Sequence, residues 1–522
     1  MGVSETKKKI MWVDDEIELL RPHIMFLEER GYEVTGVASG IEAVALSERL
    51  RFDVVLLDEM MPGMGGLETL EGIKNADPAV PVIMITKSEE EELMDEAIGK
   101  RIDDYLTKPV NPSQIFMACK RILDARKIRE GMVVRDYVPE FNRLVGLSSS
   151  GLDWQGWADA CSRIAAWELR LDEVGDEGLL QSHHDQKKEM SIEFCRFVEN
   201  NYASWVHGDE RPVLSLDLFS RFAAPLISAG RRVYFVVIDC MRLDQWMCLE
   251  PILQPYFDID RHVYYSILPT ATPYSRNAIF SGLFPSELAR KYPDKWESGD
   301  SENRGRNRFE RDLLELQISR LGLKIRPAVK YFKVYNAEEG NSVKRQVSSL
   351  SSFPLVAMVF NFVDILAHGR SESEILQELA PDEGGFRSLM RSWFTHSSLF
   401  EILKSVAKED AAVIITTDHG SVLGKRAALV KGDRETSTNL RYKFGNNIGC
   451  DERQAVNVKD PEDFKLPSEG LNRNYLMAKE DYYFVYPTRF HEFEKHYKGS
   501  FQHGGISMEE MVIPCSVLTP KT

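Results

Sequence analysis

Ligand-type side chains stand where hydrophobic runs of this chain stop. Asp239 ends the run that begins at Tyr234, Asp364 follows the run 355–363, and Asp418 follows the run 413–417. In an open α/β sheet, functional sites form at the carboxyl ends of the strands. We therefore predict an α/β sheet with a site at one edge in the second half of the chain. Seven side chains suit this site, in the order Asp239, Thr272, Asp364, His368, Asp418, His419 and His503.

The composition bounds the class of protein. A chain of 522 residues is expected to hold more than one domain. The net charge of −16 argues against binding to duplex DNA, which needs a basic surface. No apolar run is long enough for membrane insertion, and the seven cysteines form no CxxC pair, which is typical of a reducing compartment. We expect a cytoplasmic protein.

The N-terminal part alternates short apolar runs with helical patterns. Apolar runs at 10–13, 54–57 and 82–85 each end at a polar residue, and a further run covers 104–107. Such alternation with about five strands predicts a doubly wound parallel sheet. We place this first domain at 1–125.

The rest of the chain changes character twice. Trp157, Cys161 and Ile164 recur at helical spacing, which predicts a helical bundle over 126–225. The strand–helix pattern returns over 226–522, where the polar stretches 286–352 and 425–500 are expected to be insertions over a core sheet. The predicted fold class is thus α/β, with a helical middle domain.

An acidic cluster is expected at the edge of the N-terminal sheet. Asp14, Asp15 and Asp58 follow strand runs, and acidic oxygens there suit Mg²⁺. With the metal bound, Asp58 is able to attack a phosphoryl donor. Lys108 would pair with the added charge, and Thr86 would hydrogen-bond it. The Lys108–Pro109 bond is expected to be cis.

Residues 8–125 resemble the receiver domain of two-component response regulators. The stretch from Val54 to Gly66, VVLLDEMMPGMGG, is close to the family pattern around its phosphoacceptor. The resemblance implies that Asp58 is the phosphoacceptor and that a sensor histidine kinase is the partner. It further implies a Mg²⁺ site at Asp14, Asp15, Asp58 and the Met60 carbonyl, with Thr86 and Tyr105 as the switch pair and homodimerisation on phosphorylation.

The second site has the residues for two metal ions. Asp364 and His368 are four residues apart, so on a helix they face one side, and with His503 they form a set that suits Zn²⁺. Asp239, Asp418 and His419 form a second set. Two such sets at one sheet edge make the two-metal clamp that stabilises an in-line displacement at phosphorus. Zinc fits these ligands better than manganese does.

A hydroxyl group at a helix start is the candidate nucleophile. Pro273 and the apolar residues after it indicate a helix that starts near Thr272, where the positive end of the helix favours phosphate. Arg276, one turn on, is expected to contact phosphate oxygens. Thr270 and Ser275 are rival hydroxyls, and Thr272 ranks first because it directly precedes the proline.

The order of these residues resembles the alkaline phosphatase superfamily, and within it the PglZ-domain branch, over about 226–522. The stretches that carry the resemblance are VVIDCMRLD at 236–244, TATPYS at 270–275, NFVDILAH at 361–368, TTDHG at 416–420 and HGG at 503–505. The resemblance implies Thr272 as nucleophile, one zinc at Asp364, His368 and His503, and the other at Asp239, Thr272, Asp418 and His419. The chain departs from many phosphatases by a threonine in place of serine, and the stretch 272–276 does not match the sulfatase motif C/S-x-P-x-R.

Receiver, helical bundle and PglZ domain in this order resemble a family of response regulators of the type IX secretion system. That resemblance implies contacts with secretion components and a sigma factor. The function predicted is a zinc phosphodiesterase under the control of Asp58 phosphorylation, with short linear or cyclic oligonucleotides as substrates. One alternative is a docking platform in which zinc is structural. A DNA-binding regulator is disfavoured by the charge and by the lack of a helix-turn-helix tail.

Overall fold

The computed structural model describes residues 7–78, 80–87, 102–149, 151–296, 307–432, 439–468, 473–487 and 490–521. These residues fall into two compact units, 1–136 and 137–522. Helix α5 (Pro112–Ser149) begins in the first unit and ends in the second. The predicted domain boundaries near 125 and 225 stay predictions.

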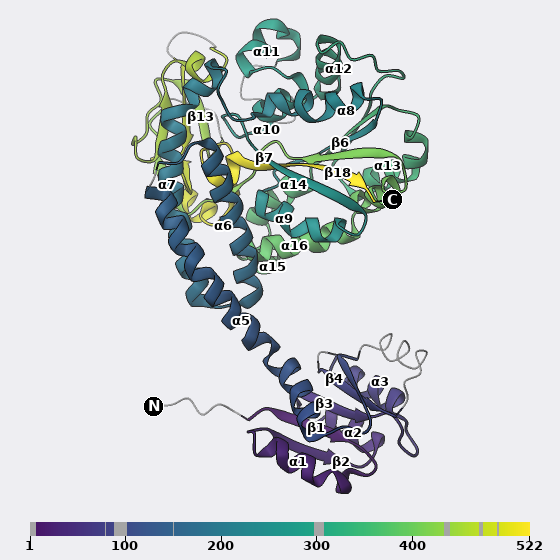
Figure 1. Cartoon of the computed structure of the whole chain (residues 1–522). Coiled ribbons are helices and arrows are strands. Elements are labelled where there is room, and N and C mark those ends of the chain that lie inside the picture. Colours follow the sequence, from purple (N-terminus) through teal and green to yellow (C-terminus); the bar gives the residue numbers. More distant parts are fainter. Residues whose placement is uncertain are drawn as a thin grey trace. The chain divides into compact units, whose positions relative to one another are not determined.

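The first unit is a doubly wound parallel sheet, as predicted. Its strand order is β2-β1-β3-β4-β5, and every neighbouring pair is parallel. Side chains alternate between the faces of a strand, so Met11 and Val13 enter one core cluster while Ile10 and Trp12 enter the other. Both faces are therefore covered by helices (Figure 1). The elements are β1 (Lys9–Val13), η1 (Ile17–Leu20), α1 (Arg21–Glu28), β2 (Glu33–Val37), α2 (Gly40–Ser47), β3 (Val54–Asp58), α3 (Gly66–Ala76), β4 (Val82–Thr86) and β5 (Asp104–Thr107).

The second unit is built on a six-stranded sheet in the order β7-β18-β10-β6-β9-β8. Strands β10, β6, β9 and β8 are parallel, and β18 runs antiparallel to β10 and β7. Tyr234 and Val236 of β6 enter one core, and Phe235 and Val237 enter the other. Figure 1 shows α8, α10, α11 and α12 on one side of this sheet and α9, α14 and α16 on the other. The strands are β6 (Arg232–Ile238), β7 (Phe257–Tyr265), β8 (Lys330–Val334), β9 (Leu355–Phe360), β10 (Ala411–Thr416) and β18 (Val512–Pro520).

The helices of the second unit cover the sheet and the connections. They are α8 (Ala224–Ser228), α9 (Leu243–Leu253), α10 (Thr272–Ser281), α11 (Pro285–Lys291), α12 (Glu310–Arg320), α13 (Ala337–Leu350), α14 (Phe362–Glu372), α15 (Glu374–Leu379), α16 (Glu383–His396), α17 (Ser398–Val406), α18 (Phe490–Tyr497) and α19 (Met508–Met511). Short 3-10 or π turns lie at Ser215–Asp217, Phe219–Ala223, Pro293–Lys295 and Pro461–Phe464.

The predicted insertions differ from each other in the structure. Stretch 286–352 is not wholly an insertion, because β8 within it pairs with β9 and forms an edge of the main sheet. Stretch 425–500 forms small separate sheets, β12 with β16 and β13-β15-β14. The strands outside the main sheet are β11 (Val422–Leu423), β12 (Arg426–Leu429), β13 (Tyr442–Asn446), β14 (Ala455–Val458), β15 (Arg473–Ala478), β16 (Tyr482–Val485) and β17 (Phe501–Gln502).

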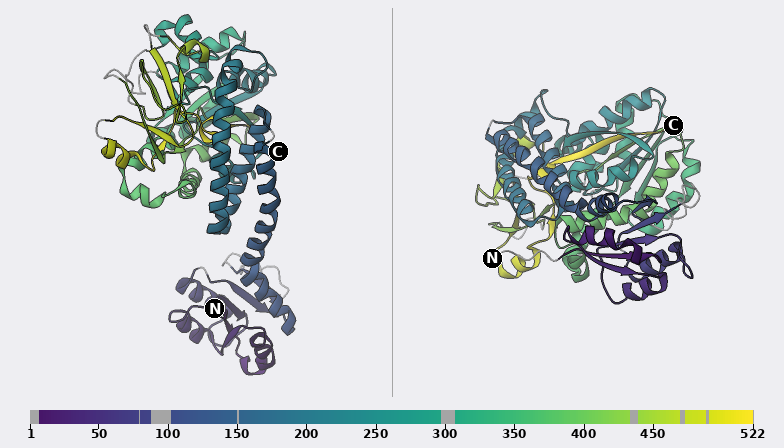
Figure 2. Two further views of the ribbon diagram at one scale, coloured as in Figure 1. Left: turned by 90° about the vertical axis from the view of Figure 1, so that its left-hand side faces the viewer. Right: turned by 60° about the horizontal axis from the view of Figure 1, so that its bottom comes forward.

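The middle of the chain is helical, as predicted, and packs against the sheet domain. Helices α6 (Trp154–Val174) and α7 (Glu177–His207) run side by side (Figures 1 and 2). Trp157 of α6 and Phe194 of α7 share a core with Tyr265 of β7 and Tyr274 of α10. The helical segment from 137 onward thus belongs to the same compact unit as the sheet.

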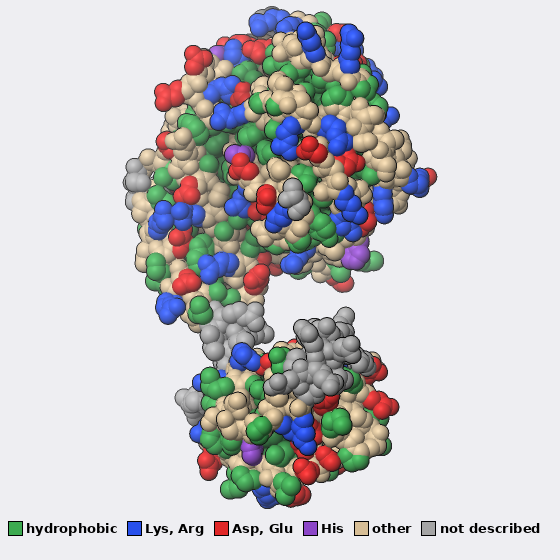
Figure 3. All heavy atoms as spheres, turned by 45° about the vertical axis from the view of Figure 1, so that its right-hand side comes forward, with side chains coloured by type: hydrophobic (Ala, Val, Ile, Leu, Met, Phe, Trp, Pro, Cys, Tyr) green, Lys and Arg blue, Asp and Glu red, His purple; other side chains and the backbone are tan. Residues whose placement is uncertain are grey.

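The surface of the second unit is electrically mixed. On the face seen in Figure 3, basic and acidic side chains are interspersed among apolar ones. Within the described part of the chain, none of the helices combines the length and apolarity that crossing a membrane requires.

Candidate functional sites on two sheet edges

The acidic residues predicted for the first unit come together at the carboxyl edge of its sheet. Ligand atoms of Asp14, Asp15 and Asp58 lie within 4.8 Å of one another. Lys108 Nζ lies 2.9 Å from Asp58 Oδ1 and 3.2 Å from Asp14 Oδ2. The peptide bond after Lys108 is cis, as predicted. The geometry therefore offers acidic oxygens for a hard cation, two from the buried Asp14 and Asp58 and one from the exposed Asp15.

Burial controls the charges in this cluster. It raises the pKa of Asp58, with further increases from Asp14 and Asp15, although the contact with Lys108 opposes it. Burial alone would lower the pKa of Lys108, but the Asp58 and Asp14 carboxylates outweigh it and raise that pKa. A cation at the three carboxylates would relieve the same repulsion, so the residues present fit Mg²⁺.

The remaining residues predicted for the receiver lie close by. Thr86, at the end of β4, donates a hydrogen bond to the Glu59 carboxylate. Tyr105 on β5 has an exposed side chain, and Met60 lies two residues after Asp58 with its side chain exposed. The hydroxyl of Thr86 is thus held by Glu59, which directly follows the phosphoacceptor candidate, while the aromatic ring of the predicted switch pair is exposed.

The residues predicted for the second site form two clusters. Asp364, His368 and His503 make one group, and Asp239, Asp418 and His419 make the other, each with ligand atoms within 4.8 Å. His368 Nε2 lies 3.2 Å from His503 Nε2, and Asp364 Oδ1 lies 3.4 Å and 3.5 Å from these two nitrogens. The rings of His419 and His503 stack with centroids 4.2 Å apart. The two clusters are therefore neighbours.

Local structure explains how residues so far apart in sequence meet. Asp239 follows β6, and Asp418 with His419 follows β10, the parallel neighbour of β6. The run to Val363 is not all strand, because β9 stops at Phe360 and α14 begins at Phe362. Asp364 and His368 consequently project from one side of the first turns of a helix, as their spacing predicted.

Thr272 is the hydroxyl that faces these clusters. It is the first residue of α10, and its Oγ1 lies 3.0 Å from His419 Nε2. His419 Nδ1 lies 3.1 Å from the Gly420 carbonyl, to which it donates, so the Nε2 lone pair points at the hydroxyl. The two rivals are engaged elsewhere, because Thr270 donates to the Gly505 carbonyl and Ser275 to the Ala271 carbonyl.

Arg276 does not lie where a substrate contact was predicted. Its guanidinium is fully buried and pairs with Asp239, with Asp418 Oδ2 at 2.9 Å and with Glu310 Oε1 at 3.5 Å. Its place on α10 brings it near the candidate nucleophile Thr272, but its guanidinium pairs with acidic side chains. The arginine holds the ligand carboxylates in position, and its role as a phosphate contact is not supported.

The ionisation of the second site is set by burial. Burial raises the pKa of Asp239 to about 7, with Asp418 and Asp364 adding to the shift and Arg276 opposing it. Burial lowers the pKa of His419 to about 3, which keeps its imidazole neutral and able to bind a metal. For Asp364, burial is outweighed by the two histidines, which hold the pKa of its carboxyl well below the usual range.

The clusters fit a metal centre on independent grounds. Among the described atoms, Asp239 Oδ1 is a buried carboxylate oxygen that accepts no hydrogen bond, whereas Asp364 Oδ1 pairs with the two histidine nitrogens. Leaving a charged oxygen buried and unpaired is costly, and cations are the usual solution. Carboxylate and imidazole ligands together are those that zinc prefers.

Three features of the site escaped sequence reasoning. Asn361 Nδ2 donates to Asp239 Oδ2 at 2.8 Å, so it orients a candidate ligand. Asn361 directly follows β9, and the strand-end rule applied to the other residues would have found it. Glu310, which pairs with Arg276, has no such signal.

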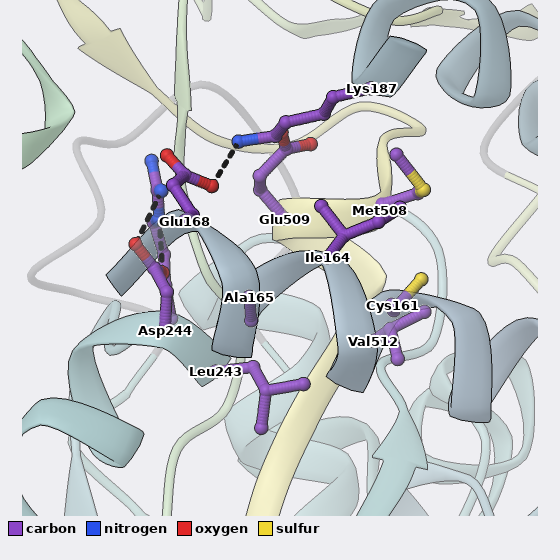
Figure 4. A pocket seen from close by; sticks show the side chains of 11 residues that line it. Cys161, Ile164, Ala165, Glu168, Lys187, Leu243, Asp244, Met508, Glu509 and Val512 are labelled. Carbon is purple, nitrogen blue, oxygen red and sulfur yellow. Dashed lines mark hydrogen bonds and ion pairs between the residues drawn. The ribbon is translucent and has the colours of Figure 1, made fainter. Parts of the chain in front are cut away.

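The third feature is a buried ion network between the helical segment and the sheet domain (Figure 4). Lys187 of α7 reaches Glu168 of α6 at 3.1 Å and Glu509 at 3.0 Å. The remaining pairs join Arg242 to Asp244 and Glu383, and Arg387 to Glu168, Asp172 and Asp244. Arg242 stands three residues after Asp239, so the network fixes the loop that carries a candidate ligand.

The fold and these sites define a class of protein, a response-regulator receiver joined to an alkaline-phosphatase-like domain. The chain belongs to the PglZ family, since the model of the BREX system PglZ alkaline phosphatase-like domain matches residues 218–518, more than half of its length. The response regulator receiver domain matches residues 10–120, and the PorX response regulator linker domain matches residues 127–206. Together the three matches are those of a PorX-like response regulator, in agreement with the resemblance found in the sequence.

Curated relatives match the receiver part. The transcriptional regulatory protein ResD of Bacillus subtilis is 36% identical over 115 residues, which are 22% of this chain and 48% of ResD. The sensory transduction protein RegX3 of Mycolicibacterium smegmatis is 36% identical over 116 residues, 22% of this chain and 50% of RegX3. The chain thus spans about half the length of the curated relatives that it matches.

Solved structures also match in this part. The chemotaxis protein CheY4 of Vibrio cholerae has 31% identity and a TM-score of 0.22, and the match covers 23% of this chain and all of CheY4. A CheY-like receiver domain protein of Methanospirillum hungatei has 33% identity and a TM-score of 0.22, with 23% and 96% covered.

Proposed function

We propose that this chain is a phosphodiesterase that uses two zinc ions and the Thr272 nucleophile under the control of Asp58 phosphorylation. The observation that carries the proposal is the placement of one hydroxyl, at the start of a helix, beside two adjacent Asp/His clusters, with Thr272 Oγ1 3.0 Å from His419 Nε2. A helix N-terminus favours the negative charge of a phosphoryl group. This arrangement favours a site for attack on phosphorus over a purely structural metal site, because a structural site does not need a hydroxyl group beside the ligands.

The proposed zinc ligands follow the two clusters. Asp364, His368 and His503 would hold one ion, and Asp239, Thr272, Asp418 and His419 would hold the other. When bound, the ions would lower the pKa of the Thr272 hydroxyl and neutralise the charge on the phosphoryl oxygens. In the receiver, Asp14, Asp15, Asp58 and the Met60 carbonyl would hold Mg²⁺.

The proposed reaction has two steps, in which Thr272 reacts and other residues hold the ligands in place. The Thr272 hydroxyl gives up its proton and its Oγ forms a bond to phosphorus, while the bond from phosphorus to the leaving oxygen breaks and that oxygen takes up a proton. In the second step the oxygen of a water molecule forms a bond to phosphorus, the bond from phosphorus to Thr272 Oγ breaks, and the proton lost by the water returns to Oγ, which releases a phosphomonoester. Arg276 holds Asp239 and Asp418 during both steps, and Asn361 fixes Asp239. We propose short linear or cyclic oligonucleotides as substrates, by analogy with the superfamily.

Control would begin at the receiver. A sensor histidine kinase phosphorylates Asp58. The side chains of Lys108 and Thr86 then bind the new phosphoryl group, Tyr105 changes its position, and the chain forms homodimers. The ion network supports a role for the helical segment, because Lys187 on α7 shares Glu383 with Arg242, which is close in sequence to Asp239. Type IX secretion components and a sigma factor are the proposed partners of this cytoplasmic regulator.

The decisive experiment compares hydrolysis of bis-p-nitrophenyl phosphate by the zinc-loaded protein and its Thr272→Val variant. Loss of the nucleophile should lower kcat by about a thousand-fold or more, with the zinc content and the melting temperature retained. Ser275→Ala, which removes a buried hydroxyl on the same helix, is the matched control and should keep activity. No hydrolysis by the wild-type protein with zinc at full occupancy would instead favour the docking platform.

A further inference from the structure

Glu510, on the short helix α19, contacts a loop from each of the two metal-ligand clusters. Its backbone carbonyl accepts a hydrogen bond from the Gly420 N–H at 3.1 Å, and Gly420 directly follows the candidate ligand His419. Its side-chain Oε1 accepts a hydrogen bond from the Gly505 N–H at 2.9 Å, and Gly505 stands two residues after the candidate ligand His503. One residue therefore holds a ligand-bearing loop of both clusters.

Both loops pass so close to their neighbours that only glycine fits. A Cβ at Gly420 would lie 1.9 Å from the Glu509 carbonyl oxygen. A Cβ at Gly505 would lie 2.6 Å from Arg441 Nη2. Atoms at these distances overlap, so a larger side chain would push either loop away from its place. The last glycines of the stretches TTDHG and HGG are thus explained by close packing against α19 and Arg441.

Arg441 fixes the direction of the Glu510 carboxylate. Both side chains are completely buried. Arg441 Nε donates to Glu510 Oε1 at 3.2 Å and Nη2 donates to Oε2, a two-point pairing to which the guanidinium fork is suited. Arg441 Nη1 donates to the carbonyls of Lys479 and Tyr482, which hold the arginine itself. The carboxylate therefore has a defined orientation, with Oε1 toward Gly505.

A further pair of hydrogen bonds joins the same loop to the segment of the candidate nucleophile. Thr270 Oγ1 donates to the Gly505 carbonyl at 2.8 Å and accepts from the Gly504 N–H at 3.1 Å. Thr270 stands two residues before Thr272. The Gly505 peptide that Glu510 binds is thus also linked to the segment that carries the nucleophile.

We propose that Glu510 is a positioning residue that sets the spacing of the two metal-ligand clusters, and that Arg441 orients it. Glu510 acts through the peptide groups beside His419 and His503, whose rings stack with centroids 4.2 Å apart. The inference rests on the proposed function, because two ions clamp one phosphoryl group only when they lie about 3.5–4 Å apart. Glu510 itself neither reacts nor binds the ions.

Two conservative changes separate the reach of Glu510 from its charge. Glu510→Asp keeps the charge for Arg441 but shortens the side chain and withdraws the acceptor from Gly505. It should weaken zinc binding by about 10- to 100-fold, the range typical of groups that hold metal ligands, with the melting temperature close to that of the wild type. Glu510→Gln keeps the length and an acceptor oxygen but leaves the buried Arg441 without its counter-ion. It should lower the melting temperature and keep zinc affinity close to that of the wild type.

Two readouts on the full chain test the inference. Zinc affinity is measured by competition with a chelating dye, and the magnetic coupling of two Co²⁺ ions in place of zinc is measured by electron paramagnetic resonance at saturating Co²⁺. The coupling depends on the distance between the ions, so Glu510→Asp should change it, whereas a loss of stability alone should not. Glu409→Asp is the matched control, because it shortens a partly buried glutamate that pairs with Arg232 at the other end of β6 from Asp239. It should keep both readouts.

Three outcomes would overturn the inference. The first is unchanged zinc affinity and coupling in Glu510→Asp. The second is an equal loss in Glu510→Asp and in either Glu510→Gln or Glu409→Asp, because the effect would then not follow the contact with Gly505. The third is failure of Glu510→Asp to fold, since Glu510 would then support the fold and not the site. Neither readout needs turnover, so a wild-type chain that binds two coupled ions and cleaves no ester would refute the proposed function alone.

Discussion

The receiver site and the second site of this chain balance the charge of their carboxylates in different ways. In the receiver, Asp15 is exposed and the lysine among the carboxylates has a side chain 20% exposed. In the second site, Asp239, Asp418 and Arg276 are almost completely buried, and three histidines stand among the carboxylates. An open cluster with a movable lysine suits a group that is added and removed. A closed site in which burial keeps His419 neutral suits ions that stay bound.

The largest expected effect concerns the open cluster. Asp58→Asn should abolish phosphoryl uptake from a small donor such as acetyl phosphate, because Asp58 is the proposed phosphoacceptor and lies 2.9 Å from Lys108. Uptake is measured by a mobility shift on phosphate-binding gels. Asp53→Asn, which alters a surface pair with Lys8 and a hydrogen bond from the Lys9 N–H, should behave as wild type in this assay. If the Asp58 variant still took up the phosphoryl group in full, the acceptor would be another residue. The receiver site would then not be the place where a group is added and removed.

The next effect concerns the frame around the closed site. Lys187→Met would remove the cation that Glu168, Glu383 and Glu509 share, leaving Arg387 for Glu168 and Arg242 for Glu383, which should destabilise the second unit by up to about 3–5 kcal/mol. Urea unfolding followed by tryptophan fluorescence measures this loss. Lys188→Met alters the exposed neighbour on the same helix and should cost little. Equal stability of the two variants would show that the network does not support the fold.

A smaller effect is expected at the residue that orients a ligand. Asn361→Leu removes the hydrogen bond to Asp239 and should weaken zinc binding or diester turnover by about 10- to 100-fold. Zinc affinity is measured by competition with a chelating dye. Asn201→Leu, on α7, removes an amide that bonds only to its own helix and serves as the control. An unchanged affinity would mean that Arg276 alone positions Asp239.

The smallest effect is a pH dependence of stability in the helical segment. Burial lowers the pKa of His183 to about 4, so the folded protein keeps it neutral beside the Tyr137 hydroxyl. In the unfolded chain the pKa of this histidine is about 6.5, so protonation favours the unfolded chain below that pH. The free energy of unfolding is therefore unaffected by His183 above pH 6.5 and falls as the pH drops toward 4, by at most about 2 kcal/mol at pH 5. His183→Gln should flatten this acid limb in urea unfolding between pH 7 and pH 5. The exposed His184→Gln should not, and an equal slope in both variants would contradict the assignment.

Much of the fold followed from the sequence because its signals are local. Runs such as 232–238 and 411–416 alternate between two buried faces and stop at polar residues, so both parallel sheets were predictable. Strand β8 was missed because its residues 330–334 include two lysines and are mostly half-buried, as an edge strand allows. Edge strands lack the continuous apolar run by which central strands are recognised.

The candidate metal ligands were also predictable, whereas the partners of Arg276 were not. Asp239, Asp364, Asp418 and their histidines stand at strand ends or at helical spacing, so the chain order alone brings them to one edge. Whether Arg276 faces a substrate or three carboxylates depends on Glu310, which arrives from α12 without any local pattern.

The sequence alone determined which residues reach each sheet edge, because strand and helix periodicity are properties of neighbouring residues. Only the tertiary structure decided what those residues meet there. The ion network of Lys187, Arg242 and Arg387 and the pair of Arg441 with Glu510 join segments far apart in the chain. Such contacts depend on how whole elements pack, and the energy of a buried charge depends on the partners that packing provides.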